Sequence, residues 1–581
     1  MSKNIARLAV TAGLTAALSF GGVMAPVTMA FAAGTPTVAT DGNVKIDEKT
    51  YKDTTFKGIQ IFKAKVTQNY DGSAWSGDKT LSDIDWASPD VMSVVTGAFT
   101  GVAEAPAANA GAQAWAKYIK DNAGNKVGQT AKVDAGSTLD KIAAALEGST
   151  LTWTNPGDSS KGDFKALNTG YWLFVTANVG STTSSDSANG NTDAYTSPIF
   201  TVVGGEDVKA EPKKDVPNVT KAVKDDAVDG TFGTFENPNK AADSQMGDYV
   251  DYLLTGTVAS NINTYSTYKY TFTDELPKSM TPKFKDGSTT PDVTVKIGDT
   301  EVKTDCYTAK YVNDKITVDF TDLKSCTDES GNSIVLNSGS KVTVEYKAKL
   351  DSTKIFENGK IKDEFKGLVG KAQKNKVTLT YSNNPHAEGV GATVEHPAYD
   401  YTYGIDVTKV GSDDETKGLK GVEFTLQEQG DTNKFIMANG VKTTDEAKAK
   451  LTTDDSGKLN VVGLDEGTYV LTEVTPAPGY NNSAANGVTF TIKRDLYQNG
   501  DDVTPSADSA INAANGVVKN NSATASTGKL SFIIVDQQGS GLPLTGLNGV
   551  TFTWIAGGAV LCIGVAHLIR SRKQAEESEQ E

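Results

Sequence analysis

The stretch Gly467-Thr468-Tyr469-Val470-Leu471-Thr472-Glu473 decides the fold of the C-terminal part of this chain. Apolar and polar residues alternate along it, which is typical of a β-strand with one face in a core. Because alternate residues of a strand share a face, we expect Tyr469, Leu471 and Glu473 to point the same way. The pattern therefore predicts that a carboxyl group enters a hydrophobic core.

Two other stretches place charged side chains on apolar faces by the same parity. Lys409 follows Ile405 and Val407 on one face of residues 405–410, and Asp536 follows two apolar residues on one face of residues 530–536. Unpaired buried charges cost several kcal/mol, so one lysine and two acids in a core predict a paired cluster. The alternatives are a simple buried ion pair, or a bulge that changes the parity.

Such a cluster has its own chemistry. Burial lowers the pKa of a lysine and raises that of a carboxyl group, so a neutral amine can coexist with protonated acids. A neutral Lys409 amine is a nucleophile, and Glu473 can polarise the carbonyl of Asp536 and carry protons. Their condensation would leave an amide cross-link between two strands and release water.

Short alternating strands recur through the rest of the chain. Residues 219–223, 249–258, 268–272, 315–320, 341–350 and 376–381 alternate in this way, and turn residues separate them. This spacing predicts a β-sandwich, and residues 403–539 predict a second, more compact one. We expect a mainly β protein with three tandem immunoglobulin-like sandwiches, because the chain is too long for one core.

The first of these domains is expected to contain inserted helices. Strands are predicted at residues 56–62 and 170–175, and helices at 112–119 and 139–146, with Ser137 or Thr138 as the N-cap of the second helix. Residues 180–192, rich in small polar side chains, predict a mobile loop. The expected organisation is a signal peptide (1–32), a first domain (33–207), a linker (208–218), a middle domain (219–400), a C-terminal domain (401–540) and a terminal signal (541–581).

The N-terminus carries a processing signal. Lys3 and Arg7 precede a mostly apolar stretch at residues 8–20, and Ala30-Phe31-Ala32 offers a small-x-small cleavage site. This pattern predicts a secretory signal peptide. An N-terminal membrane anchor is the alternative, and the glycines and proline within residues 21–26 argue against it.

The C-terminus carries a second signal. Leu542-Pro543-Leu544-Thr545-Gly546 precedes an apolar run at residues 547–569, which is long enough to cross a bilayer, and a basic cluster at residues 570–573. This arrangement resembles the LPxTG sorting signal of Gram-positive surface proteins. In that family a sortase cysteine attacks the threonine–glycine bond and transfers the threonine carbonyl to an amine. The resemblance implies a secreted, cell-wall-anchored protein, held only transiently by its transmembrane run, with a housekeeping sortase and peptidoglycan as partners. An ordinary C-terminal anchor is the alternative.

The composition narrows the range of possible functions. The net charge of −16 argues against a nucleic-acid binder, which would show a basic face. Of three cysteines, Cys562 falls in the apolar run, and an oxidising compartment permits a disulfide between Cys306 and Cys326, with two free thiols as the alternative. No nucleophile motif or metal-ligand spacing accompanies the three histidines. We therefore expect no enzyme, no cofactor and no metal site.

Residues 469–480, Tyr-Val-Leu-Thr-Glu-Val-Thr-Pro-Ala-Pro-Gly-Tyr, resemble the E-box of Gram-positive pilins, and their frame resembles the collagen-adhesin B-type (CnaB) domain. In those domains the E-box glutamate catalyses an isopeptide bond from a lysine to an asparagine or aspartate. Residue by residue, this implies Glu473 as the catalytic acid and Lys409 with Asp536 as the joined pair. The sequence departs from the family at Asp536, where pilins usually carry asparagine.

Residues 376–385, Lys-Val-Thr-Leu-Thr-Tyr-Ser-Asn-Asn-Pro, resemble the last strand of the middle domain of these pilins. There an asparagine bonds the lysine of the first strand, and an aspartate is the catalyst. The resemblance implies a bond from Lys221 to Asn383 with Asp274 as the catalytic acid; Asn384 and Asp248 are the alternatives. Asn383 as a turn residue and Asp274 as a solvated acid remain open. We expect no cross-link in the first domain, which has no matching asparagine near its end.

The linker residues Val208-Lys209-Ala210-Glu211-Pro212-Lys213 resemble the pilin motif, whose usual form is Val-x-Val-Tyr-Pro-Lys; Glu211 replaces the tyrosine. The resemblance implies that Lys213, or alternatively Lys214, receives Thr545 of another copy. An acceptor after the first domain and a donor after the third give head-to-tail growth. Such growth does not close into a ring and produces an open filament.

Together these resemblances imply the major (backbone) shaft subunit of a sortase-assembled pilus, or fimbria, that supports adhesion. Its expected partners are a pilus-type (class C) sortase, other copies of itself and tip or minor pilins, with host matrix or glycans as further candidates. The alternative is a wall-anchored adhesin that does not polymerise and binds host matrix or glycans. A reactive linker lysine distinguishes the two.

Overall fold

The computed structural model describes residues 19–20, 34–51, 53–124, 126–127, 130–157, 161–179, 190–225, 230–493, 496–499, 502–505, 512–514, 517–524 and 528–539. The sorting motif at 542–546, the apolar run behind it and most of the predicted signal peptide lie outside these residues. Within the described part of the chain, no helix is both long and apolar enough to cross a bilayer.

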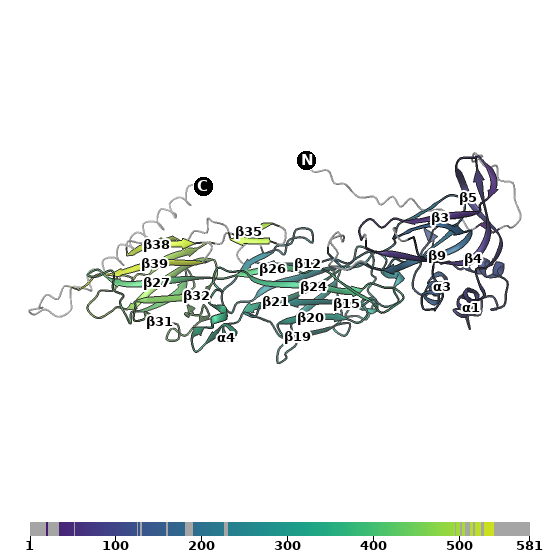
Figure 1. Ribbon diagram of the computed structural model, residues 1–581. Helices are drawn as coiled ribbons and strands as arrows, with labels where there is room; N and C mark the ends of the chain where they lie inside the picture. The colour runs from purple at the N-terminus through teal and green to yellow at the C-terminus, as the bar shows by residue number, and fades with distance from the viewer. Residues whose placement is uncertain are drawn as a thin grey trace, which may run out of the picture.

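Three groups of β-sheets follow one another along an elongated molecule, in chain order from the purple to the yellow end of the colour scale (Figure 1). Each group encloses buried apolar side chains, and the first contains two separate cores. The predicted fold class, a mainly β chain of tandem sandwiches, is confirmed.

The first group, residues 19–20 and 35–210, combines two larger sheets, a two-stranded sheet of β6 (Lys126–Val127) and β7 (Thr130–Ala131), and three helices. One sheet contains β1 (Ser19–Phe20), β2 (Thr35–Val38), β4 (Thr55–Tyr70), β5 (Trp75–Trp86), β9 (Gly170–Asn178) and β10 (Ile199–Val203), and the other contains β3 (Asp41–Ile46), β8 (Asp163–Asn168) and β11 (Val208–Ala210). The helices are α1 (Pro89–Gly97), α2 (Ala112–Asp121) and α3 (Thr138–Glu147). Ser137 is the N-cap of α3, because its hydroxyl accepts the Asp140 N–H at 3.3 Å.

The second group, residues 219–401, packs two sheets face to face. The first contains β12 (Val219–Lys224), β14 (Val250–Thr257), β16 (Met280–Pro282), β17 (Val293–Ile297), β18 (Thr300–Glu301) and β21 (Lys341–Leu350). The second contains β13 (Ala241–Asp243), β15 (Tyr270–Glu275), β19 (Thr308–Val312), β20 (Lys315–Phe320), β24 (Gln373–Ser382), β25 (Val390–Ala392) and β26 (His396–Tyr401). The alternating apolar residues of these strands form one continuous core.

The third group, residues 403–536, is a smaller sandwich. One sheet contains β27 (Tyr403–Gly411), β32 (Lys458–Leu464), β38 (Val518–Thr524) and β39 (Lys529–Asp536), and the other contains β28 (Glu423–Glu428), β31 (Leu451–Thr452), β33 (Gly467–Thr475), β34 (Val488–Ile492) and β37 (Asn512–Ala514). The long strands β27 and β39 are parallel neighbours, with Gly411 opposite Asp536. The irregularity in β27 lies at its start, between Tyr403 and Gly404, so the parity further along the strand is undisturbed.

The first and second groups meet through a buried histidine. His386, from the loop after β24, lies between two acids of helix α3, with Nε2 at 2.8 Å from Asp140 Oδ1 and Nδ1 at 2.7 Å from Glu147 Oε1. Burial lowers the pKa of His386, but the two hydrogen bonds outweigh it and raise the pKa to about 9. A protonated His386 therefore fastens the middle sandwich to the first.

The predicted disulfide is not present. Cys306 and Cys326 are free thiols. The Cys306 Sγ atom instead accepts the Thr327 N–H at 3.2 Å, and burial together with the Cys306 thiol raises the pKa of Cys326. The second sandwich thus depends on its apolar core and not on a disulfide.

Candidate cross-linking sites

A buried lysine in the third sandwich lies between two carboxyl groups. Lys409 on β27 contacts Asp536 Oδ1 on β39, and its Nζ atom is 2.9 Å from Glu473 Oε2 on β33. All three side chains are completely inaccessible to solvent. The lysine and the aspartate come from the parallel pair of one sheet, and the glutamate reaches them from the facing sheet. The structure thus brings together the three residues that strand parity predicted.

The surroundings of this cluster shift the pKa of its glutamate and leave two of its carboxyl oxygens without partners among the described residues. Burial raises the pKa of Glu473 to about 7, although the neighbouring Lys409 opposes the shift. The outer carboxyl oxygens, Glu473 Oε1 and Asp536 Oδ2, are buried and have no hydrogen-bond partner among the described residues. Asp536 Oδ1 accepts the Ser483 N–H at 3.1 Å, so a backbone donor polarises the carboxyl group next to the amine.

The second sandwich holds a comparable cluster around Lys221 on β12. Lys221 Nζ donates to Asp274 Oδ1 on β15 and, at 2.9 Å, to the Tyr346 hydroxyl on β21, which itself donates to Asp274 Oδ2. Asn375 on β24 donates from Nδ2 to the same hydroxyl at 2.7 Å. All four side chains are buried, and burial lowers the pKa of Lys221 to about 8 while it raises that of Asp274.

The asparagine beside Lys221 is therefore Asn375, and the structure does not bring Asn383 there. Asn375 lies on the inward face of β24 and Asn383 directly after its last residue, but Asp274 is opposite Val377, so Asn383 lies six residues, about 20 Å, further along the chain. Asn383 Nδ2 donates instead to the Asp193 carbonyl oxygen of the first group at 3.1 Å. Asn375 has the same strand parity as Asn383 and lies eight residues earlier in the chain, so the sequence pattern fits both asparagines.

The two alternatives for this site also lie elsewhere. Asn384 forms a turn in which its Oδ1 accepts the His386 N–H at 3.0 Å. Asp248 is exposed and lies 3.3 Å from Lys442 of the third group. Asp274 is fully buried, which removes the interpretation of a solvated strand-end acid.

The two linker lysines differ in their exposure to solvent. Lys213 is exposed, although its ammonium group is near enough to the protein for burial to lower its pKa. Its backbone is fixed between the first two groups, because its N–H donates to Thr196 Oγ1 at 2.8 Å and its carbonyl accepts from Ser197 N and Asn261 Nδ2. Lys214 is buried against the acids Glu48 and Asp193. Of the two candidates, only Lys213 is accessible to another protein.

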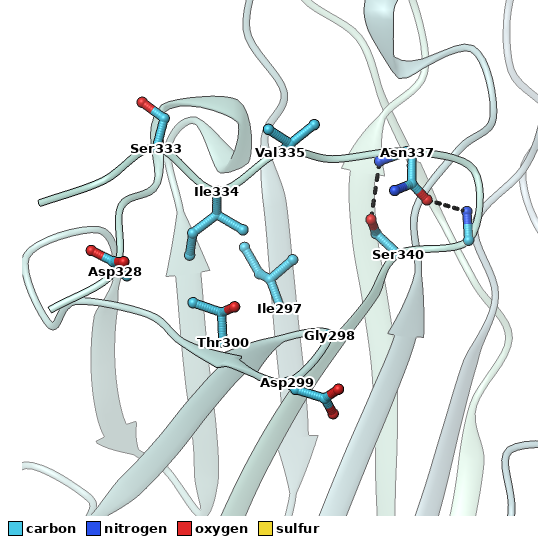
Figure 2. A pocket seen from close by; sticks show the side chains of 11 residues that line it. Ile297, Gly298, Asp299, Thr300, Asp328, Ser333, Ile334, Val335, Asn337 and Ser340 are labelled. Atoms are coloured by element: carbon cyan, nitrogen blue, oxygen red, sulfur yellow. Dashed lines mark hydrogen bonds between the residues drawn. The ribbon is translucent and has the colours of Figure 1, made fainter. Parts of the chain in front are cut away.

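The middle sandwich also carries a depression, shown in Figure 2, between the turn after β17 and residues 328–340. Ile297 and Ile334 face its centre, whereas Asn337 and Ser340 form a turn at one side through a 3.0 Å hydrogen bond. None of the residues in the lysine clusters lines it. The residues that line it are aliphatic, small, uncharged polar or acidic.

Comparison with known families identifies part of the third group. Residues 404–504 match the SpaA family, a prealbumin-like fold domain. The matched SpaA domain includes Lys409 and Glu473 but ends before Asp536. A search of curated proteins found no match.

Solved structures give resemblances in fold at low identity. The chain is similar to the T6 backbone pilin of serotype M6 Streptococcus pyogenes, with 14% identity and a TM-score of 0.48 over 88% of this chain and 100% of that one. It is also similar to the full-length major pilin SpaD of Corynebacterium diphtheriae, with 16% identity and a TM-score of 0.43 over 86% and 98% of the two chains. BcpA, the major pilin subunit of Bacillus cereus, matches with 15% identity and a TM-score of 0.35 over 65% and 89%.

Proposed function

We propose that this protein is the major structural subunit of a covalently polymerised surface pilus. A sortase joins Thr545 of one copy to Lys213 of the next, and two intramolecular amides, Lys409–Asp536 and Lys221–Asn375, stabilise each copy. The observation that carries the proposal is the pair of buried lysine–acid clusters in two consecutive sandwiches, both located between the acceptor and the donor in the chain.

The amide of the third group forms by condensation. The amine of Lys409 attacks the carboxyl carbon of Asp536, a C–N bond forms, and the carboxyl hydroxyl leaves with one amine hydrogen as water. Glu473 accepts the proton from nitrogen and delivers it to the departing oxygen, which suits a carboxyl group whose pKa is about 7. The Ser483 N–H stabilises the negative charge that develops on Asp536 Oδ1.

The amide of the middle sandwich releases ammonia. The amine of Lys221, whose pKa burial lowers to about 8, attacks the side-chain carbonyl carbon of Asn375. The Tyr346 hydroxyl, which contacts the lysine, the asparagine and Asp274, carries protons between them. Buried Asn375 Oδ1 has no hydrogen-bond partner among the described residues. In the proposed reaction a protonated Asp274 polarises this oxygen.

Assembly follows from the position of the linker lysine. Lys213 lies after the first group, and Thr545 follows the third, so each joint leads to a further copy and the product is a filament. A pilus-type sortase forms these joints, and a housekeeping sortase attaches the base to peptidoglycan after the transient membrane run is removed. Tip or minor pilins and host matrix or glycans are the proposed further partners of a shaft that supports adhesion.

The test uses the full chain, expressed in a Gram-positive host together with a pilus-type sortase. We expect a ladder of products that survives boiling in detergent, and its loss in Lys213→Ala. Lys209→Ala is the matched control, because Lys209 is an exposed lysine of the same linker region and should leave the ladder intact.

Two results would contradict the proposal. A ladder that persists in Lys213→Ala would remove Lys213 as the acceptor. A single wall-attached species from the unmodified chain would refute polymerisation and favour the non-polymerising adhesin.

A further inference from the structure

A third lysine is buried with an aspartate and a glutamate, at the junction of the first and second groups. Lys214 Nζ contacts Asp193 Oδ2 and lies 2.5 Å from Glu48 Oε2. The side chains of Lys214 and Glu48 are only 7% and 8% exposed, and that of Asp193 is inaccessible. No sequence pattern predicts this cluster, because Glu48 and Lys214 are far apart in the chain.

The surroundings exclude water from this site. The ring of buried Tyr51 lies over Lys214, with 5.1 Å between Nζ and the ring centroid. The end of β24 covers the other side, because Asn383 Nδ2 donates to the Asp193 carbonyl oxygen at 3.1 Å and the Tyr381 hydroxyl donates to the neighbouring Thr192 carbonyl. Contact between the two sandwiches thus closes the site, which also gives Asn383 its place in the fold.

The two carboxyl oxygens of Asp193 have different hydrogen-bond partners. Oδ1 accepts the Ala194 N–H at 2.7 Å. Oδ2 contacts Lys214 and also receives the hydroxyl of buried Thr54. One oxygen is therefore held as a future amide carbonyl, and the other lies beside the amine together with a proton donor.

Glu48 is fixed in the position of a proton carrier. Its Oε1 atom accepts the N–H groups of Thr50 and Tyr51 at 2.8 and 2.9 Å, which fixes the orientation of the carboxyl group. Its buried Oε2 atom accepts no hydrogen bond of good geometry among the described residues, although Lys214 lies next to it. The outer oxygens of Glu473 and Asp536 show the same lack of partners in the third group.

We propose that Lys214 and Asp193 form a third intramolecular amide, which Glu48 promotes. The Lys214 nitrogen attacks the carboxyl carbon of Asp193, a C–N bond forms, and the bond from this carbon to Oδ2 breaks. The hydroxyl of the acid and one hydrogen of the amine leave as one water, and no oxidant, metal or other reactant is needed. Burial raises the pKa of Asp193, against the opposing effect of Lys214, which favours the protonated acid that this condensation consumes.

Such a bond would attach the linker to the first group one residue after the acceptor lysine. Lys213 would then project from a backbone fixed covalently at the next residue. The inference uses the same chemistry as the proposed amide of Lys409, but it concerns a different pair of residues and can fail separately.

The decisive experiment is intact-mass measurement and peptide mapping of residues 33–545, purified under reducing conditions. This product contains every residue from 34 to 539 that the structure describes. We expect a total deficit of two waters and one ammonia, with a cross-linked peptide that joins Asp193 to Lys214. A deficit of one water and one ammonia, with Lys214 unmodified, would overturn this inference and leave the other two amides standing.

Variants assign the roles within the cluster. Glu48→Gln keeps both joined residues and should restore one water to the mass, while Glu211→Gln, at an exposed linker glutamate, should not. Lys214→Arg keeps the positive charge and should lose the same cross-linked peptide. A peptide that joins Lys214 to Glu48, or full cross-linking in Glu48→Gln, would contradict the assignment of Asp193 as the acceptor and Glu48 as the promoter.

Discussion

Replacement of Glu473 by glutamine gives the sharpest test of the proposed amide formation between Lys409 and Asp536. The change keeps Lys409 and Asp536 in place and alters one buried oxygen, so the fold should be retained while the proton carrier is lost. The expected product lacks the Lys409–Asp536 amide and is heavier than the parent by one water, apart from the residue change itself.

The loss of stability can be estimated from the loop that the amide closes. This loop runs from residue 409 to residue 536, roughly 127 residues, and the chain-entropy relation gives about 5 kcal/mol for a cross-link of that span. For a domain of this size that corresponds to a fall in Tm of about 15–25 °C. Strain and residual structure in the unfolded chain reduce the measured value, so the estimate is an upper bound.

Differential scanning calorimetry of residues 33–545 is the assay, with the mass of each sample measured in parallel. Glu446→Gln is the matched control, since Glu446 is exposed on the same sandwich and should change neither mass nor Tm. A Glu473→Gln protein with the full mass deficit would refute the role of Glu473. An unchanged Tm together with a missing amide would refute the estimate of its contribution.

Three other predictions follow from the middle sandwich. Asn375→Ala should abolish the loss of ammonia, whereas Asn383→Ala should keep it; peptide mapping decides, and the opposite pattern would restore the original prediction. The pKa of His386 is raised to about 9 from about 6.5, so its contribution, on the order of 3 kcal/mol, is complete below pH 6.5 and is lost as the pH rises to 9. The Tm should fall as the pH rises between these values in the parent and much less in His386→Gln, and an equal pH dependence of the two would contradict this role. Because Cys306 and Cys326 are free, adding a reductant should leave the Tm unchanged, and a lower Tm would indicate a disulfide.

The sequence predicted the cluster of Lys409, Glu473 and Asp536 because it depends on local strand periodicity. Residues on a regular strand keep a fixed parity, and the irregularity of β27 lies before this part of the strand. The resemblance to the pilin E-box implies the same roles for these residues as the chemistry of a buried amine and two acids does. Both kinds of information were present within short stretches of the chain.

The middle cluster shows the limit of that reasoning. Parity assigned the correct face of β24 but not the position along it, because the level at which Lys221 meets this strand depends on how two sheets pack. Asn375 and Asn383 satisfy the same pattern, and only the register of β15 against β24 distinguishes them.

The cluster of Lys214 with Glu48 and Asp193 was beyond sequence reasoning for a similar cause. Its members come from the loop after β3, the segment before β10 and the linker, and the closing contacts come from the middle sandwich. None of these segments has a periodic pattern. Burial of Lys214 followed only from the packing of one sandwich against the next, so the linker pattern alone left both lysines as candidates.

The parallel pairing of β27 and β39 has a consequence for how far the filament can stretch. An unfolded segment of the length between Lys409 and Asp536 would extend by about 400 Å. With the proposed amide in place, tension that enters β27 crosses to β39 at Lys409 and leaves after Asp536, so the intervening chain carries no load. The third group of each copy would then remain at its folded length under a pull that would unravel the same sandwich without the bond.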